Sequence, residues 1–235
     1  MNYYLFMNLT VVVPFYNEEK FLNESVSKLE SVKVAKYIYL IDDCSTDNSL
    51  AIAKDLTKKY DNVKLFTKNI NEGKGSCLKY IQNQIETTHL IMHDADLEQN
   101  PFNISDIFNI AKENKDSLII GSRTLGKANR IKKYKLLALA NFLLSLIFNL
   151  LHFSRISDIS SGYIMYSVDF LNSINIKEKS FGIEVEIISK FVKLNKNIIE
   201  IPIDYSGRTY ADGKKIKISD GFNIFFKILK YRFTD

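Results

Sequence analysis

Two carboxylates, Asp94 and Asp96, have the spacing in this sequence that most clearly fits a chemical task. They follow an apolar run at 89–93 that predicts a strand. Two carboxylates so placed can share one hard divalent cation, which keeps positions for phosphate oxygens and water. Taken alone, an Asp-x-Asp pair is better explained by a helix cap or a solvated loop. The position after a buried strand reverses that preference and favours a metal-bridged diphosphate as the ligand.

Acidic residues also follow two other predicted strands. Glu18 comes shortly after the first strand, and Asp42 and Asp43 end the second. Three acidic strand ends would repel one another unless a cation or a set of hydrogen-bond donors lies between them. A carboxylate at the second place can accept hydrogen bonds from a base N–H or a ribose hydroxyl. The alternative is that the Asp pair only ends a strand, while Ser45 or Asp47 caps the next helix.

Other patterns exclude several classes of protein. The glycine-rich turn at 73–76 looks like a phosphate loop, but Lys68 stands where a Walker A motif needs glycine. The turn is equally a glycine-rich entry to a helix. We interpret His89, His93 and His152 as structural, because the first two lie four apart in a strand rather than on a helix face. Neither a Gly-x-Gly-x-x-Gly after the first strand nor a Gly-x-Ser-x-Gly occurs, which disfavours dehydrogenases and serine hydrolases.

The candidate residues need a scaffold that brings strand ends together. Apolar β-branched runs alternate with helical stretches through the first half, which is typical of a parallel sheet with helices on both faces. Ligands of such sheets bind beyond the carboxyl ends of the strands, where the acidic residues lie. The expected strands are 9–13, 36–41, 63–67, 89–93 and 117–121, and the expected helices are 18–30, 48–60, 74–86 and 104–114.

The pattern changes in the second half. No internal repeat, low-complexity run or linker separates the two halves, so we expect one domain over 1–235, with halves at 8–122 and 123–235. A basic loop at 123–135 contains six Lys or Arg residues and no acid. The elements expected after it are an apolar helix at 136–151, a strand at 163–166, a helix at 183–194, a strand at 197–203 and a basic tail at 214–232.

The apolar helix carries one polar stripe, in which Asn141, Ser145 and Asn149 recur every four residues. With the basic loop before it, this pattern suits an interfacial helix over about 130–152 on an anionic membrane. The alternative is a core or dimer helix. The apolar run is shorter than the ~20 residues needed to cross a bilayer, and the basic tail at 214–232 offers a second amphipathic face. We therefore expect peripheral attachment to a membrane surface.

Composition sets the broad class. With 235 residues and 46% hydrophobic content, the chain can bury a sizeable core, and disorder is excluded. A net charge of +5 is too weak to argue for a nucleic-acid partner. Cys44 and Cys77 are too few and too far apart for a thiolate metal site, so we interpret them as buried thiols in a reducing compartment. The first seven residues lack the features of a signal peptide, and we expect a cytoplasmic location.

Most of these residues belong to a series of short motifs. The motifs are 11–14 with 18–19, 41–43 with 48–49, 73–75, 94–96, 121–123, 160–162, 181–184 and 208–214. Their order and spacing resemble those of the family 2 glycosyltransferases of GT-A fold, in particular the dolichyl-phosphate mannosyltransferase-like branch. The resemblance covers roughly residues 8–233. Each motif is modest by itself, whereas the set is highly specific.

The resemblance implies a GT-A nucleotide-diphospho-sugar transferase fold, with a mostly parallel central sheet, and a divalent-metal cofactor, Mg²⁺ or Mn²⁺. Asp96 would be the main metal ligand beside Asp94. The family's next metal-contacting residue, usually Gln in the mannosyltransferases, falls on Glu98, which makes Glu98 the third predicted metal ligand. This departure adds a negative charge near the metal. The residues implied to bind the nucleotide sugar are Pro14, Tyr16, Glu18, Asp42, Asp43, Lys74, Asp94, Ala95, Asp96, Arg123, Arg208 and Lys214.

The residues that the reaction requires follow from the charges of its leaving group and its acceptor. Departure of a nucleoside diphosphate builds negative charge, which a metal, Arg123 and Arg208 can neutralise. A polyprenyl phosphate acceptor is substantially dianionic at neutral pH, because its second pKa is near ~6, and can attack without a general base. A sugar hydroxyl would need a carboxylate to accept its proton, and Asp158 and Glu184 are the candidates. For Asp158 and Glu184, a structural role in holding the loop is supported equally well.

The function that we favour is an inverting transfer of a hexose from a UDP- or GDP-linked donor to polyprenyl phosphate at the cytoplasmic membrane face. One alternative keeps the fold and donor but uses a saccharide or glycolipid hydroxyl acceptor, as in cell-surface polysaccharide synthesis. A further alternative is a silent nucleotide-sugar-binding, membrane-associated module. The intact set of Asp94, Asp96, Arg123 and Arg208 argues against that module.

Overall fold

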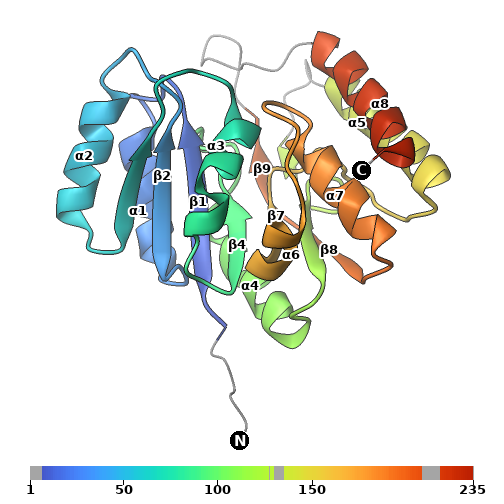
Figure 1. The fold of residues 1–235 in the computed structure, drawn as a ribbon, viewed down its shortest axis with the longest axis horizontal. Coiled ribbons are helices and arrows are strands. Elements are labelled where there is room, and N and C mark those ends of the chain that lie inside the picture. Colours follow the sequence, from blue (N-terminus) through green and yellow to red (C-terminus); the bar gives the residue numbers. More distant parts are fainter. Residues whose placement is uncertain (1–6, 127, 130–134, 208–217, 235) are drawn as a thin grey trace, which may run out of the picture.

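A seven-stranded sheet forms the centre of the protein in a computed structural model, which describes residues 7–126, 128–129, 135–207 and 218–234. Its strands are β1 (Leu9–Phe15), β2 (Tyr37–Asp42), β3 (Val63–Thr67), β4 (His89–Met92), β5 (Leu118–Ser122), β7 (Ile164–Ser167) and β8 (Ile198–Pro202). They lie in the order β3-β2-β1-β4-β7-β5-β8 (Figure 1). A small separate sheet pairs β6 (Ala128–Asn129) with β9 (Tyr205–Ser206).

The central sheet is parallel apart from one strand. β7 runs antiparallel to both of its neighbours, β4 and β5, while every other pair is parallel. Ile164 at the start of β7 pairs with Ile120 near the end of β5, so the chain re-enters the sheet from the edge at which β5 ended. The mostly parallel sheet predicted from the sequence is confirmed. The reversal of β7 brings the residues before that strand, rather than those after it, to the carboxyl edge of its parallel neighbours.

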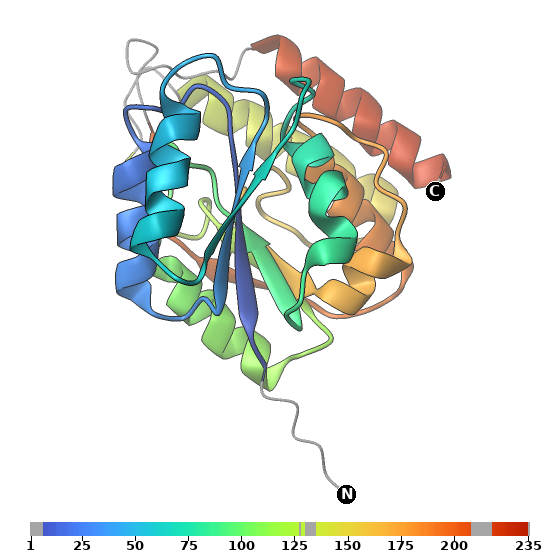
Figure 2. The ribbon, with the colours of Figure 1, turned by 60° about the vertical axis from the view of Figure 1, so that its left-hand side comes forward.

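Helices cover both faces of the sheet, as expected (Figure 2). The helices are α1 (Leu22–Val32), α2 (Ser49–Lys59), α3 (Lys74–Ile81), α4 (Asn103–Glu113), α5 (Lys135–His152), α6 (Val168–Ser173), α7 (Ile183–Lys193) and α8 (Ile218–Phe233). Side chains of α1, α2 and α4 form the core on one face, and those of α3, α6 and α7 form it on the other. α8 packs against α7 and against α5. None of the helices in the described part of the chain is long and apolar enough to span a bilayer.

The element boundaries differ from the prediction in a few places. α1 begins at Leu22 rather than at Glu18, because Asn17 is in the left-handed region (φ 53°) and the next residues form a turn. The Glu18 carbonyl accepts hydrogen bonds from the N–H groups of Phe21 and Leu22 in that turn. Only the first part of the predicted helix 74–86 is α-helical, as α3, and a short 3-10 turn at Gln82–Gln84 follows it. α6, β6 and β9 were not predicted, since two to six residues show no usable periodicity.

All three histidines are buried and hydrogen-bonded, in agreement with their structural interpretation. His93 is fully buried between the hydroxyls of Ser25 (2.9 Å) and Tyr163 (2.7 Å). Burial lowers the pKa of His93 to about 4, so the ring is neutral at neutral pH. His89 and His152 each bond a backbone carbonyl. These rings connect parts of the core and are not arranged as metal ligands.

Candidate active site

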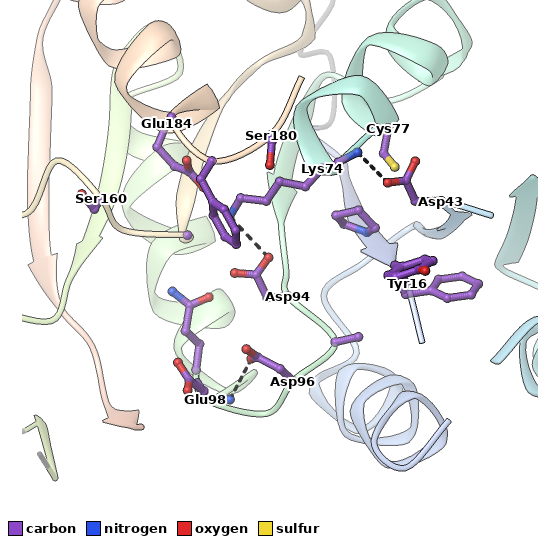
Figure 3. Close-up of a pocket in the computed structure, with 18 of the residues that line it drawn as sticks. Tyr16, Asp43, Lys74, Cys77, Asp94, Asp96, Glu98, Ser160, Ser180 and Glu184 are labelled. Atoms are coloured by element: carbon purple, nitrogen blue, oxygen red, sulfur yellow. Dashed lines mark hydrogen bonds and ion pairs between the residues drawn. The ribbon is translucent and has the colours of Figure 1, made fainter. Parts of the chain in front are cut away.

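A cavity of about 310 Å³ opens at the carboxyl edge of the central sheet. Its wall is built from the ends of β1, β2 and β4, the loops beside β5 and β7, and the first residues of α3 and α7 (Figure 3). The predicted site residues in this wall are Pro14, Tyr16, Glu18, Asp43, Lys74, Asp94, Ala95, Asp96, Glu98, Arg123 and Glu184. Arg208 and Lys214 lie outside the described residues.

The turn after β1 brings Tyr16 and Glu18 into the cavity wall. It is joined to the loop after β2 by hydrogen bonds. The side-chain oxygen of Asn17 accepts from the N–H of Thr46 at 2.8 Å, and the N–H of Glu18 donates to the Ser49 hydroxyl at 2.8 Å. Asn tolerates the left-handed backbone that this turn requires. The two strand ends predicted to hold the nucleoside therefore form one connected rim.

Asp43 holds the loop that precedes α3. Its carboxylate accepts hydrogen bonds from Lys68 Nζ at 2.6 Å and from the N–H groups of Glu72 at 3.1 Å and Gly73 at 2.6 Å. Gly73 has a φ of 98°, a conformation that favours glycine. The sequence predicted that this carboxylate binds the nucleoside. In the structure it has protein partners and fixes the position of Lys74.

Asp42 and Cys77 flank Asp43 and have structural environments. The Asp42 carboxylate, 2% exposed, does not line the cavity and accepts a hydrogen bond from the N–H of Ser45 at 3.0 Å. This arrangement matches the alternative in which the Asp pair ends a strand. Burial, followed by the nearby Asp43 carboxylate, raises the pKa of the Cys77 thiol to about 12, so the thiol is neutral.

Lys74 is the cation at the centre of the cavity (Figure 3). Its Nζ lies 3.5 Å from Asp94 Oδ1 and forms an ion pair with Glu184 in the first turn of α7. Burial alone would lower the pKa of Lys74, but the two carboxylates outweigh burial and raise it above its ordinary value. The sequence singled out these three residues but did not predict that they form one network. Lys74 joins the Asp-x-Asp loop to α7.

The side chains of Asp96 and Glu98 take different directions. Asp96 lines the cavity and accepts a hydrogen bond from the N–H of Glu98 at 3.1 Å. The Glu98 carboxylate, in a residue only 8% exposed, accepts one from the Tyr205 hydroxyl at 2.5 Å. Within the described ranges, no three His, Cys, Asp or Glu side chains are grouped so that they could hold a metal ion. The predicted trio does not converge, because Asp94 turns to Lys74 and Glu98 turns to Tyr205.

Arg123 reaches the cavity from the end of β5 and is held there by Asp158. The fully buried Asp158 carboxylate accepts from Arg123 Nε at 2.8 Å and from Nη2 at 2.7 Å, and Asn141 of α5 donates to it at 2.9 Å. Burial alone would raise the pKa of Asp158, but the guanidinium outweighs burial and lowers it. Asp158 was predicted as a candidate base. It does not line the cavity and instead orients Arg123.

The wall also includes residues that were not among the predicted site residues. They are Phe15, Asn71, Gly73, Cys77, Gln99, Ser160, Gly162, Ser180, Phe181, Gly182, Val185, Tyr205 and Ile224. Motifs at 160–162 and 181–184 belonged to the family resemblance and were therefore a usable signal. Gln99 had no such signal, because it lies outside those motifs. Ile224 comes from α8, so the C-terminal helix contributes directly to the cavity.

The loop between α6 and α7 lines the cavity and is fixed on both sides. On the side of α3, the Lys179 carbonyl accepts from the N–H of Ser76 at 2.9 Å. On the side of α8, the Glu178 carboxylate accepts from three donors of that helix. These donors are Lys227 Nζ at 2.8 Å, Lys230 Nζ at 2.9 Å and the Tyr231 hydroxyl at 2.7 Å. The loop therefore connects the start of α3 to α8.

We expect acid to loosen this connection. Burial alone would raise the pKa of Glu178, but the three α8 donors outweigh it and lower the pKa from 4.5 to about 2. A lowered folded-state pKa contributes stability above the unfolded value, and the contribution is lost as the pH falls toward the folded value. The free energy of unfolding, measured by urea titration, should therefore decrease between pH about 4.5 and about 2. The decrease should be shallower in Glu178→Gln; identical slopes would contradict this role.

The fold is that of the GT-A nucleotide-sugar transferases. Glucosyl-3-phosphoglycerate synthase from Mycobacterium tuberculosis, crystallised with Mn²⁺, uridine-diphosphate-glucose and phosphoglyceric acid, superposes with a TM-score of 0.75. The superposition covers 97% of this chain and 81% of that one at 14% identity. At that identity the likeness concerns the fold alone.

The chain belongs to glycosyl transferase family 2, whose profile matches residues 10–174. Among similar curated proteins is the dolichyl-phosphate beta-glucosyltransferase ALG5D of Trichomonas vaginalis, 25% identical over 94% of this chain and 72% of that protein. Another is the undecaprenyl-phosphate mannosyltransferase of Micrococcus luteus, 23% identical over 88% of this chain and 87% of that protein. Both names describe transfer of a sugar to a polyprenyl phosphate.

Proposed function

We propose that this chain transfers a hexose, with inversion, from a UDP- or GDP-linked donor to the phosphate of a polyprenyl lipid. The choice of acceptor rests on one observation, which is that both candidate bases are engaged by cationic side chains. Asp158 is fully buried beneath Arg123, and Glu184 is ion-paired with Lys74. A hydroxyl acceptor needs a base to accept its proton, whereas a phosphate dianion does not. The names of the two relatives support the same acceptor class.

The residues of the cavity have distinct parts in this proposal. Lys74 and Arg123 supply positive charge on two sides of the wall and would stabilise the departing diphosphate. Arg123 is pre-oriented, because its Nε and Nη2 atoms already donate hydrogen bonds to Asp158. Tyr16 and Glu18 form the rim at which we place the nucleoside. Positioning and charge compensation by these side chains would then carry the catalysis.

A divalent cation, Mg²⁺ or Mn²⁺, fits this site through few protein ligands. Such cations are commonly held by one or two carboxylates together with substrate phosphates. Asp96 lines the cavity, and the Asp94 carboxylate is 36% exposed beside it in the same loop. We propose that these two residues would hold the cation and that Glu98, bonded to Tyr205, would not. When bound, the cation would neutralise charge on the leaving diphosphate.

α5 supports attachment to a membrane because its polar stripe points inward. Asn141 bonds Asp158, the Ser145 hydroxyl accepts from the N–H of Ile159 at 3.3 Å, and Asn149 accepts from the N–H of Ile156 at 2.8 Å. Phe148 is buried in the core, but several other large apolar side chains point outward. Those at least 48% exposed are Leu139, Phe142, Leu143, Leu146 and Leu150. An ordinary surface helix exposes polar side chains, so this exposed apolar face disfavours a helix wholly within the core. Of the alternatives to a membrane helix, it leaves a dimer helix.

α8 extends this apolar face. It packs against α5 and leaves Phe222, Phe226 and Phe233 at least 64% exposed. Lys and Arg side chains also lie on this helix, as in helices that rest on anionic lipid. We propose that α5 and α8 together lie on the membrane surface beside the cavity. The free thiols of Cys44 and Cys77 support placing the protein at the cytoplasmic, reducing face.

The proposed function is tested with a panel of nucleotide sugars. Purified protein is incubated with UDP-glucose or GDP-mannose and Mg²⁺ or Mn²⁺, with and without a short polyprenyl phosphate. Nucleoside diphosphate release and lipid-linked sugar are both measured. Product that requires the lipid supports the proposal and identifies the donor. Transfer to saccharides but not to the lipid would contradict the acceptor, and donor binding without any turnover would favour the silent module.

Membrane attachment is tested by changing only the outward face of α5. Replacing Leu146 and Leu150 with Gln removes apolar area that would enter the lipid, and burying one Leu side chain contributes about 1.5–3 kcal/mol. Co-sedimentation with vesicles containing anionic lipid should therefore weaken by about tenfold or more. Phe102→Ser, a change at a residue that is 55% exposed and directly precedes α4, is the control and should leave binding unchanged. Equal effects of both changes would contradict the proposed surface.

A further inference from the structure

Gln99 is a buried polar side chain that the proposed function does not yet use. The residue is 5% exposed and lines the cavity. In the described part of the protein, its side-chain oxygen has no hydrogen-bond partner. Buried polar atoms are nearly always paired, and leaving one unpaired destabilises the fold. Because this unpaired oxygen belongs to a residue of a ligand cavity, we expect its hydrogen-bond partner to be a group of the ligand.

The carboxamide packs closely against Gly162 at the cavity wall. A Cβ atom placed on Gly162 would lie 3.1 Å from Gln99 Oε1, 3.2 Å from Nε2 and 3.0 Å from Asp94 Oδ2. Both polar atoms of the amide and the carboxylate therefore converge beside Gly162, which itself lines the cavity. The backbone of Gly162 does not occupy the left-handed region. Glycine at this position thus permits the close approach of these two side chains and is not needed for conformational freedom.

The backbone around Gln99 is held in place. Gln99 forms an antiparallel bridge with Tyr205, and the N–H of Ser206 donates to the Glu98 carbonyl at 2.8 Å. The Glu98 side chain bonds the Tyr205 hydroxyl on the same strand. These contacts fix the segment on which Gln99 stands. Its side-chain oxygen is therefore pre-positioned for a ligand.

We propose that Gln99, together with Asp94, binds hydroxyl groups of the donor hexose and determines which hexose is accepted. This inference rests on the proposed function. A sugar hydroxyl both donates and accepts hydrogen bonds, as a carboxamide does. An ionised phosphate has no proton to donate, so it would leave Gln99 Oε1 unpaired. A cation would use only Oε1 and would leave the Nε2 donor of the amide unused.

Gln99→Met tests the inference, because Met has a similar length but no polar edge. In the free protein, this change removes an unpaired buried group, and the melting temperature should rise by roughly 2–4 °C. Gln84→Met is the control, since the Gln84 amide is exposed and donates to the Tyr80 carbonyl. A fall in melting temperature specific to Gln99→Met would assign the side chain a structural role and overturn the inference.

Binding of donors provides the second measurement, by calorimetry with UDP-glucose, GDP-mannose and their monodeoxy analogues. In the unaltered protein, removing the hydroxyl that Gln99 recognises should weaken binding by about tenfold or more. Gln99→Met should bind the parent donor about tenfold more weakly than the unaltered protein does. It should bind the deoxy analogue as well as it binds the parent donor. Its affinity for UDP or GDP alone should be unchanged. Gly162→Ala should likewise weaken only the nucleotide sugar, because its methyl group would lie 3.0–3.2 Å from Asp94 and the Gln99 amide and would displace both side chains.

The outcomes separate this inference from the proposed function. Equal discrimination among deoxy donors by Gln99→Met and the unaltered protein would overturn the inference and leave sugar transfer intact. A loss in Gln99→Met of Mn²⁺-dependent binding of UDP or GDP alone would assign the amide to the cation and also overturn it. Failure of the unaltered protein to bind any nucleotide sugar would overturn the proposed function, and the inference with it.

Discussion

Asp96→Asn is expected to lower turnover by two to three orders of magnitude while the fold survives. The change removes the negative charge that would hold a cation against the departing diphosphate, and single groups that stabilise such charge contribute on the order of 10²–10³ in rate. The Asn side-chain oxygen can still accept the hydrogen bond that the N–H of Glu98 donates to Asp96. Circular dichroism and the melting temperature should therefore stay close to those of the unaltered protein.

The matched control for this change is Asp106→Asn, because Asp106 is an exposed carboxylate on α4. It should leave turnover unchanged. The dependence of the rate on Mg²⁺ or Mn²⁺ concentration gives an independent readout, since the half-saturating concentration should increase strongly in Asp96→Asn only. Near-normal turnover, or an unchanged metal dependence, would contradict the assignment of Asp96.

Asp158→Asn is expected to lower both stability and turnover, because Asp158 is the buried counter-charge of Arg123. Removing one partner of a buried ion pair costs about 3–5 kcal/mol, which for a protein of this size lowers the melting temperature by about 10 °C. Turnover with the lipid acceptor should fall by about 10²-fold or more, as the guanidinium loses its orientation. Thermal unfolding and steady-state kinetics of the same preparation measure the two effects.

A double variant distinguishes the positioning role of Asp158 from that of a general base. Combining Asp158→Leu with Arg123→Met replaces the ion pair by apolar side chains, which should recover most of the lost stability. Turnover should remain low, because the Arg123 guanidinium is missing from the cavity. A general base would behave differently: Asp158→Asn would reduce turnover without reducing stability. That result would also favour a hydroxyl acceptor over a phosphate.

The sequence was sufficient to locate much of the site because its signals there are local. The run before Pro14 is apolar and β-branched, and the run before Asp94 has an apolar centre, so both indicate buried strands. The rule that ligands lie at the carboxyl ends of such strands then points to residues that do line the cavity, including Asp96 and Arg123. Local periodicity and a topological rule together therefore predict which segments meet.

The partners of individual side chains could not be predicted, because they depend on distances between remote segments. Asp158 and Glu184 looked alike as carboxylates in the sequence, yet one is sealed beneath Arg123 and the other meets Lys74. Gly162 was not assigned a role because β7 runs against its neighbours, which places the residues before that strand at the site. The inward direction of the polar stripe on α5 likewise became clear only from the packing.

The attachment of Glu178 to α8 matters for preparing the protein in soluble form. A common way to reduce aggregation is to delete an apolar terminal helix. Here the deletion would also remove the three donors that hold Glu178 and the Ile224 side chain in the cavity wall. Polar replacements at Phe222 and Phe226, which point away from the fold, would preserve those contacts. Surface redesign is therefore the better route to a soluble and intact protein.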